Sequence, residues 1–277
     1  MTSHDVVARA RRLLGTRKVG HAGTLDPMAT GVLLLGVEKA TRLLGHLMLT
    51  EKAYDATVRL GVSTTTDDAD GDPVSHTSTR GLSEGAVRSA AGAFVGELDQ
   101  VPSSVSAIKV DGRRAYARAR AGDPVALAAR RVHVESLEIT EVRRGDDHVD
   151  VDIRVRCSSG TYIRAIARDL GSALGVGGHL TRLRRTTVGP FALSEAQPLP
   201  GREEPQELRV LGLDAVVPRC FPVQAVNQVR ARDVSFGRRL ALRLESDGAV
   251  AMVDEFQRFL ALYEQRGDVA VPVAVFV

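Results

Sequence analysis

A single carboxylate, Asp26, lies in the middle of the glycine-punctuated stretch Lys18–Gly36. A carboxylate can serve as a nucleophile or as a general acid or base. Because Pro27 follows Asp26, a turn is expected there, and the apolar run Val32–Val37 behind it predicts a buried strand. An acid on a stiff turn that leads into the core is a common construction of active sites. An Asp-Pro pair also fits a helix N-cap with proline at the first helical position, and that alternative stays open here.

A second acidic stretch, Thr64–Asp72, has the composition of a calcium-binding loop but not its spacing. Placing Gly71 at the sixth loop position puts Thr77 where the bidentate glutamate must stand. We therefore interpret the stretch as an acidic, solvated turn. A glycosidase-like hydrolase would need a second carboxylate about 5–10 Å from the first. Asp68 or Asp70 could supply it, although neither has the hydrophobic context of a raised-pKa acid.

Other patterns that carry chemistry are incomplete. The serines before Gly160 lack the Gly-x-Ser-x-Gly elbow of a serine hydrolase. The glycines of Gly175–Gly178 follow a predicted helix rather than a strand, so they are no dinucleotide fingerprint. Cys157 and Cys220 are too few for a disulfide framework or a zinc quartet. We expect neither a cofactor nor a metal.

Composition favours a globular protein with an anionic partner. The 277 residues are 44% hydrophobic and 26% charged, enough for one large domain and a small one. The net charge is +3, and nearly all of the 37 basic residues are arginines, which suit phosphate and bases. A GC-rich genome produces the same arginine bias. No stretch has the roughly 20 apolar residues of a membrane span, and no signal peptide is visible, so a cytoplasmic location without membrane contact is expected.

Periodicity predicts the elements that must hold these residues. A first amphipathic helix starts near Thr2 and ends at Gly15. Polar and apolar residues alternate in the strands, and Gly160 opens a helix that places Tyr162 and Arg164 near its start. The other expected elements are helices over Lys39–Leu49 and 82–97, and strands over Lys52–Gly61, Val132–Thr140 and Val149–Cys157.

Gly20–Gly31 reads Gly-His-Ala-Gly-Thr-Leu-Asp-Pro-Met-Ala-Thr-Gly. It closely resembles Gly-His-x-Gly-x-Leu-Asp-Pro-x-Ala-x-Gly, the signature of the TruB family of tRNA pseudouridine synthases, and fills every fixed position. Further motifs follow in the family's order, and the resemblance covers roughly residues 2–195. They are a Lys-x-Tyr segment ending at Tyr54, the acidic loop, Gln100–Arg118 with Tyr116 in an expected helix, Gly160–Arg164 and His179–Arg185. Because the family has a similar acidic loop, the resemblance implies that this loop could also help to shape the site.

The resemblance implies isomerisation of uridine to pseudouridine at position 55 in the T-loop of tRNA. Uracil must detach from C1′, turn within the pocket and reattach through C5, so one carboxylate suffices and nothing is hydrolysed. Asp26 is implied as the nucleophile that acts on a flipped-out nucleotide. Whether it attacks C1′ or C6, or instead assists glycal formation, stays open.

The family also implies the residues that surround the uridine. Arg164 would be the nearby cation that keeps the carboxylate ionised. Tyr54 and Tyr162 would pack on uracil and ribose, and Tyr54 could also move a proton. Leu183 would close the pocket floor, and His21 would fill the gap or stack against the extruded nucleotide.

The fold implied is α+β, with a mixed, mostly antiparallel central sheet flanked by helices, the pseudouridine synthase fold. We expect a catalytic domain over 1–200, a proline-rich linker over 201–222, and a small β-rich, PUA-like RNA-binding domain over 223–277. Within the last, a short helix up to Gly237 and strands over Leu240–Leu244, Ala249–Val253 and Val269–Val277 are expected. Relatives carry a strand and a Lys-Pro-x-Gly turn before the equivalent of Met1. Its absence here suggests a start codon assigned too late.

The expected partner is the T-stem-loop of tRNA, bound by a monomer without an obligate protein partner. Basic side chains between 109 and 131 form a candidate phosphate track, and a solvated helix face is the alternative. These are Lys109, Arg113, Arg114, Arg118, Arg120, Arg130 and Arg131. Two other function classes stay open: the hydrolase, and a non-catalytic RNA chaperone that binds and refolds tRNA.

Overall fold

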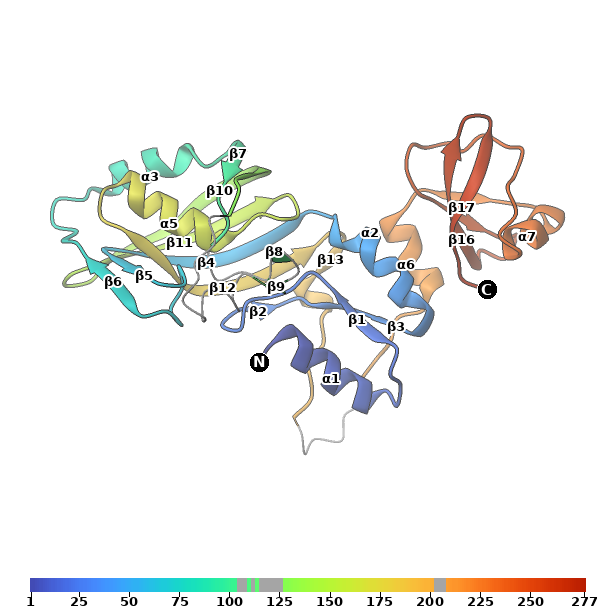
Figure 1. The fold of residues 1–277 in the computed structure, drawn as a ribbon, viewed down its shortest axis with the longest axis horizontal. Coiled ribbons are helices and arrows are strands. Elements are labelled where there is room, and N and C mark those ends of the chain that lie inside the picture. Colours follow the sequence, from blue (N-terminus) through green and yellow to red (C-terminus); the bar gives the residue numbers. More distant parts are fainter. Residues whose placement is uncertain (104–108, 111–112, 115–126, 202–207) are drawn as a thin grey trace. The chain divides into compact units, whose positions relative to one another are not determined.

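A seven-stranded sheet forms the centre of the first of two units into which the chain divides, made of Met1–Ser3, Thr24–Leu33 and Met48–Ala196. The structure, a computed structural model, describes residues 1–103, 109–110, 113–114, 127–201 and 208–277. The strand order is β13-β12-β4-β11-β10-β7, and β2 pairs with β12 off this path (Figure 1). The strands are β2 (Thr30–Gly31), β4 (Lys52–Leu60), β7 (Gly96–Gln100), β10 (Arg130–Arg144), β11 (Val149–Cys157), β12 (Gly178–Val188) and β13 (Phe191–Ala192).

The pairing of these strands confirms the predicted mostly antiparallel α+β fold. Within the described part of this sheet, only the short contact of β2 with β12 is parallel. The strands predicted over Lys52–Gly61 and Val149–Cys157 are confirmed as β4 and β11. The strand predicted over Val132–Thr140 is confirmed and extends further, as β10.

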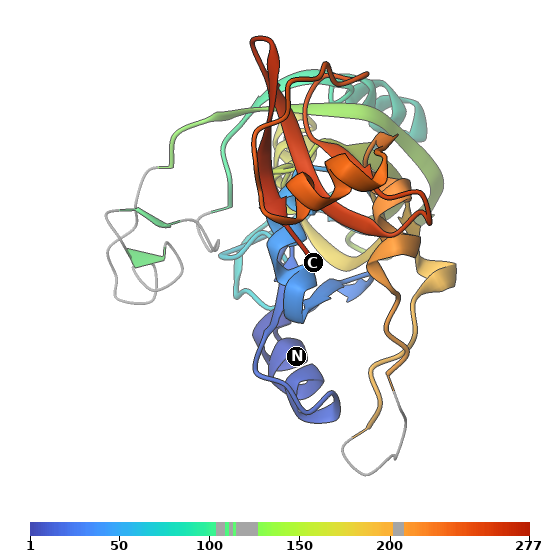
Figure 2. The ribbon, with the colours of Figure 1, turned by 90° about the vertical axis from the view of Figure 1, so that its right-hand side faces the viewer.

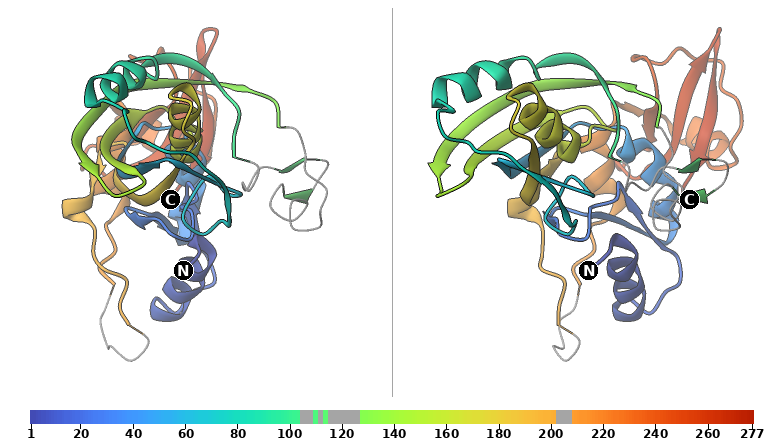
Figure 3. Two further views of the ribbon diagram at one scale, coloured as in Figure 1. Left: turned by 90° about the vertical axis from the view of Figure 1, so that its left-hand side faces the viewer. Right: turned by 60° about the vertical axis from the view of Figure 1, so that its left-hand side comes forward.

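The core of the first unit lies between one face of this sheet and two helices, α3 (Glu84–Gly92) and α5 (Ile163–Ala173). Side chains alternate between the two faces of a strand, so Tyr54 and Val58 of β4 and Val151 of β11 all point inward. Both helices cover that inner face (Figures 1 and 3). The inner face is therefore where a side chain from α5 can meet one from the sheet.

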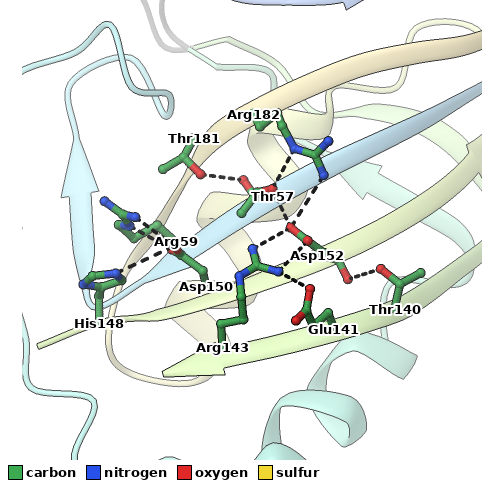
Figure 4. Close-up of polar contacts among 10 residues, drawn as sticks. All are labelled: Thr57, Arg59, Thr140, Glu141, Arg143, His148, Asp150, Asp152, Thr181 and Arg182. Atoms are coloured by element: carbon green, nitrogen blue, oxygen red, sulfur yellow. Dashed lines mark hydrogen bonds and ion pairs between the residues drawn. The ribbon is translucent and has the colours of Figure 1, made fainter. Parts of the chain in front are cut away.

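The outer face of the sheet carries a network of ion pairs (Figure 4). Asp150 of β11 accepts two hydrogen bonds of 2.8 Å from Arg59, its partner across the strands. Asp152 accepts bonds of 2.6 and 3.0 Å from Arg143 and also binds the hydroxyl of Thr57. Each guanidinium holds its carboxylate with two nitrogens, the strongest geometry for such a pair.

We expect this network to make the stability of the protein acid-sensitive. Hydrogen bonds from Arg59 and Arg143 lower the pKa values of Asp150 and Asp152, respectively, below the ordinary value of 3.8. Their contribution is present above that value, where unfolded aspartate is ionised, and is lost as the pH falls through the lower folded pKa. In urea unfolding, Asp152→Asn lowers the free energy of unfolding at pH 7 by up to about 1 kcal/mol. The difference from wild type shrinks below pH 4, whereas a constant difference would contradict the assignment.

The second unit comprises His4–Gly23, Leu34–Leu47 and Gln197–Val277. Its first part packs the inner side of α1 against the β1–β3 pair, through Val7, Ala10 and Val19. Its last part is a four-stranded sheet in the order β14-β15-β16-β17, with α7 beside it (Figure 2). The elements are α1 (Ser3–Leu13), β1 (Val19–Ala22), β3 (Leu34–Val37), a 3₁₀ helix (Glu38–Leu43), α2 (Leu44–Met48), α6 (Leu213–Cys220), β14 (Val223–Ala225), α7 (Gln228–Ser235), β15 (Val250–Val253), β16 (Phe259–Arg266) and β17 (Val269–Val275).

Several predicted elements differ from the structure in extent. Val32–Val37 is not one strand, because residues 32–33, between β2 and β3, belong to neither strand. The helix predicted over Lys39–Leu49 is a 3₁₀ turn followed by the short α2. The helix predicted over 82–97 is confirmed only over the span of α3, since the chain re-enters the sheet as β7.

The C-terminal part of the chain also differs from the elements predicted from the sequence pattern. Leu240–Leu244 is not a strand, and only Leu240 makes a bridge, to Ala270. Two strands were missed: β14, which is too short for a pattern, and β16, whose buried first half shows no alternation. The proline-rich segment 201–222 is not irregular throughout, since it contains α6 with Pro218 inside.

Some predictions concern residues whose structure is not described. The Tyr116 region and the cations Arg118 and Arg120 of the proposed phosphate track lie outside the described residues. For Lys109, Arg113 and Arg114 only the backbone is described, as the short strands β8 (Lys109–Val110) and β9 (Arg113–Arg114). No helix among the described residues is long and apolar enough to cross a membrane.

Candidate active site

Asp26 shares the guanidinium of Arg164 with a second carboxylate, Asp68. Nη2 of Arg164 donates to Oδ1 of Asp26 at 3.0 Å, and Nη1 donates to Oδ2 of Asp68 at 3.1 Å. Nη1 also donates to the carbonyl oxygen of Thr66 at 3.0 Å. Arg164 lies in the first turn of α5 and is only 4% exposed, and Asp68 is 3% exposed. The two carboxylates are thus held by one buried cation.

Asp26 is the member of this trio that solvent or a substrate can reach. Its side chain is 29% exposed, against 4% for the side chain of Asp68. Burial raises the pKa of Asp26 above its ordinary value of 3.8, and the positive charge of Arg164 opposes that rise. The arrangement suits a nucleophile, which must be ionised and accessible at the same time.

The loop around Asp26 is fixed by backbone contacts with β12. Ala29 N–H donates to the carbonyl of Asp26 at 2.9 Å, which closes a turn, so the predicted turn is confirmed and the N-cap alternative is wrong. Gly31 adopts a φ of +103°, and a Cβ there would lie 2.1 Å from the carbonyl oxygen of Arg185. Only glycine permits this approach. Val32 N–H then donates to the same oxygen at 2.9 Å, so both sides of the turn are held in place.

Arg185 fastens the same loop with its side chain, a contact that the sequence did not predict. It is 1% exposed, and its Nε donates to the carbonyl of Val32 at 2.7 Å while Nη1 lies 3.4 Å from that of Thr24. A sequence signal existed: neighbouring residues of a strand face opposite sides, so one of the paired arginines Arg184 and Arg185 must point inward. The buried cation therefore spans the two ends of the loop that carries Asp26.

Tyr54 stands opposite Arg185 in the register of β4 and β12, on the inner face of the sheet. It is 7% exposed. Burial raises the pKa of Tyr54 to about 12, and the Arg185 guanidinium opposes the rise. The hydroxyl is therefore protonated at neutral pH. Tyr54 would have to donate this proton before it could accept one from the substrate.

The other predicted site residues lie on two different units. Tyr162 directly precedes α5 and is half-buried, and burial raises its pKa while Arg130 and Arg164 lower it. Leu183 of β12 is buried in the core of the inner face. His21 lies in β1 of the second unit, where its ring meets that of His4 edge to face at 5.7 Å. Its role in binding stays a prediction.

The acidic stretch is only in part the solvated turn that we expected, because Asp70 and Asp72 are exposed whereas Asp68 is buried. It connects β5 (Val62–Thr64) to β6 (Pro73–His76), and it turns back onto β12, where Leu180 N–H donates to the carbonyl of Asp67 at 3.0 Å. This fold-back buries Asp68, whose Oδ1 also accepts from the hydroxyl of Thr66 and the backbone N–H of Asp70. The buried charge is paired by Arg164, which is distant in the sequence, so a pattern of local polarity could not reveal this burial.

Asp68 does not have the environment of the general acid that a hydrolase needs. An acid of that kind is kept protonated by an apolar pocket, as in glycosidases. Asp68 instead receives hydrogen bonds on both oxygens, one of them from Arg164. These contacts do not support Asp68 as the acid of a hydrolase. Among the described residues, no group of three or more histidine, cysteine, aspartate or glutamate side chains is placed to hold a metal ion.

Comparison with known families accounts for most of the chain. Residues 11–163 match the TruB family pseudouridylate synthase N-terminal domain. Residues 164–199 match the tRNA pseudouridylate synthase B C-terminal domain, and residues 221–277 match the C-terminal domain of tRNA pseudouridine synthase II. Two curated relatives are named tRNA pseudouridine synthase B. That of Arthrobacter sp. (strain FB24) is 52% identical, covering 99% of this chain and 92% of the relative, and that of Thermobifida fusca (strain YX) is 54% identical, covering 99% and 94%.

Solved structures show the same fold. The chain is similar over its full length to a chain in "Structure of H/ACA RNP bound to a substrate RNA containing 2'-deoxyuridine", with a TM-score of 0.71, 26% identity and 82% of that chain covered. It is also similar to one in "Crystal Structure of a Cbf5-Nop10-Gar1 Complex", with a TM-score of 0.69, 25% identity and 82% coverage. The chain belongs to the TruB family of pseudouridylate synthases. It is accordingly an isomerase that acts on uridine in tRNA.

Proposed function

We propose that this chain converts uridine 55 in the T-loop of tRNA to pseudouridine, and that Asp26 is the nucleophile. The observation that carries the proposal is the ion pair of a partly exposed Asp26 with the buried Arg164, in a chain of the TruB family. Asp26 engages the flipped-out nucleotide, and uracil leaves C1′, turns and rejoins through C5.

The remaining residues receive the nucleotide. Extrusion of the base from the loop costs a few kcal/mol of unstacking, which contacts in the pocket must offset. Tyr54 and Tyr162 pack on uracil and ribose, and Leu183 closes the pocket floor. His21 fills the gap that the base leaves or stacks against the extruded nucleotide. Burial of Tyr54 and Leu183 on the inner face, the side from which Arg164 reaches Asp26, supports these roles.

The rest of the chain binds the RNA around the uridine. Within the organisation proposed above, residues 1–200 are the catalytic domain, 201–222 connect the two parts, and 223–277 are a PUA-like RNA-binding domain. The described β14–β17 sheet and the family match over 221–277 support the last of these. The basic residues between 109 and 131 contact phosphates. The protein works as a cytoplasmic monomer without an obligate protein partner, as its own chain supplies both members of the Asp26–Arg164 pair.

The reaction itself supplies the test. A T-stem-loop RNA that carries tritium at C5 of uridine is incubated with the purified protein. Transfer of the glycosidic bond to C5 displaces that hydrogen, so we expect one tritium released per RNA and the base retained in the chain. The control RNA has cytidine at position 55 and should release none. Free uracil would instead indicate the hydrolase, and tight binding without tritium release would indicate the RNA chaperone.

A further inference from the structure

Gln100 pairs with the peptide groups of Tyr162, although the two residues are far apart in the sequence. Its Oε1 accepts a hydrogen bond of 2.7 Å from the backbone N–H of Tyr162, and its Nε2 donates one of 3.1 Å to the carbonyl of the same residue. Gln100 is the last residue of β7 and is 4% exposed. Both ends of its amide are thus used on one residue, in a site from which water is largely excluded.

Tyr162 lies at the junction between the loop after β11 and helix α5. It is the N-cap residue of α5, and its own side chain makes no capping hydrogen bond. The connection from β11 passes through Gly160 at a φ of +84°, a residue with wide conformational freedom. The amide of Gln100 therefore holds the two peptide groups of Tyr162, between which the ring is attached, at the point where the loop ends and the helix begins.

The residues after Gln100 also contact the start of α5 and the acidic loop. The carbonyl of Val101 accepts a hydrogen bond of 2.8 Å from Nη2 of Arg168, which lies one helical turn after Arg164 in α5. The hydroxyl of Ser103 donates to the carbonyl of Thr66 at 3.1 Å, the carbonyl that Arg164 also binds. The segment 100–103 thus contacts both the start of α5 and the acidic loop behind the Asp26–Arg164 pair.

We propose that Gln100 is a positioning residue, which holds the ring of Tyr162 in the orientation that receives the target nucleoside. This inference rests on the proposed function, because it assumes that Tyr162 contacts the nucleoside. Gln100 itself does not touch the substrate. The opposing view is that the pair is a purely structural polar contact, whose loss would weaken the fold without a specific effect on the reaction.

Two variants separate these views. Gln100→Met keeps the approximate size and removes both hydrogen bonds, and Gln100→Glu keeps the shape and an acceptor but removes the donor. We expect each to lower the single-turnover rate by about 10- to 100-fold, since small misplacements at a reacting centre have effects of that size. The Kd for tRNA should change less than about threefold. The control is Glu97→Gln, on the same strand, with a side chain that is 61% exposed.

A double-mutant cycle then asks whether Gln100 acts through the Tyr162 ring. We expect Gln100→Met to have less than a threefold effect on the rate when Tyr162→Ala is already present. An equal effect in both backgrounds would overturn the proposal. So would a loss of rate in Gln100→Met that merely follows a loss of folded protein, judged from thermal melting at the assay temperature.

A spectroscopic arm tests the coupling without reference to activity, and it uses the isosteric Gln100→Glu in case the methionine variant folds poorly. The chain has four tyrosines and no tryptophan. Fluorine NMR of protein labelled with 3-fluorotyrosine resolves them, and Tyr162→Phe assigns the resonance of Tyr162. Gln100→Glu should shift or broaden that resonance and leave Tyr263, in the second unit, unchanged. If the Tyr162 resonance is unchanged in Gln100→Glu, the inference is refuted. If that resonance shifts but the wild-type protein forms no pseudouridine, only the proposed function is refuted.

Discussion

Asp26→Asn binds tRNA and forms no detectable pseudouridine, which places its rate below the detection limit, at least on the order of 10,000-fold under that of wild type. The amide has the shape of the carboxylate, and its oxygen can still accept the hydrogen bond that Nη2 of Arg164 now donates to Asp26 at 3.0 Å. The loop is held through its backbone and by Arg185, so its conformation does not depend on the charge. What disappears is the negative charge of the side chain, and with it the nucleophilicity. Tritium release under single-turnover conditions measures the rate, and filter binding measures the affinity.

The matched control is Asp70→Asn, in the acidic stretch, where the side chain is exposed. It should leave the rate within about twofold of wild type, because the side chain is exposed and its charge makes the smallest of the contributions that raise the pKa of Asp26. A hydrolase that used Asp70 as its second carboxylate would lose activity in this variant. Measurable pseudouridine from Asp26→Asn would remove the nucleophilic carboxylate from the mechanism, whatever the behaviour of the control.

Local sequence was sufficient to locate the parts of the site that a turn or a helix start defines. The proline after Asp26 restricts the chain to a turn, and the glycine before Tyr162 permits the positive φ with which the loop ends, so the turn and the start of α5 were predictable. The alternation of β4 and β11 was equally visible, because one face of each strand is polar. In these cases the physical cause lies within the segment itself.

The polar groups that complete the site were not predictable in that way. Asp68, Arg185 and Gln100 are all nearly fully buried, and each is polar in a segment whose local pattern suggests exposure or gives no direction. A buried polar side chain is tolerated only when its partners satisfy it. Those partners come from distant segments, such as Arg164 for Asp68 and Tyr162 for Gln100. The strand order and register of the sheet determine which of these distant residues come into contact, and neither can be predicted from a single stretch of the chain.

Replacing Arg164 has two separable consequences, since its guanidinium serves both carboxylates. Arg164→Met leaves Asp68 buried without its cation, and loss of one partner of a buried pair costs about 3–5 kcal/mol of stability. It also removes the charge that opposes the burial of Asp26. The pKa of Asp26 then rises further, so the acidic limb of the pH–rate profile moves to higher pH. We expect the rate at neutral pH to fall by about 100-fold or more, measured on the folded fraction.

The double variant Arg164→Met/Asp68→Asn distinguishes the two roles. Removing the buried negative charge should recover much of the lost stability in urea unfolding, because no charge is then left unpaired. It should recover none of the rate, because Asp26 still lacks its cation. Arg164→Lys should fall between, since a single ammonium cannot reach with two nitrogens to both carboxylates. If the double variant regained activity together with stability, Arg164 would be a structural residue, and the ionisation of Asp26 would need another source.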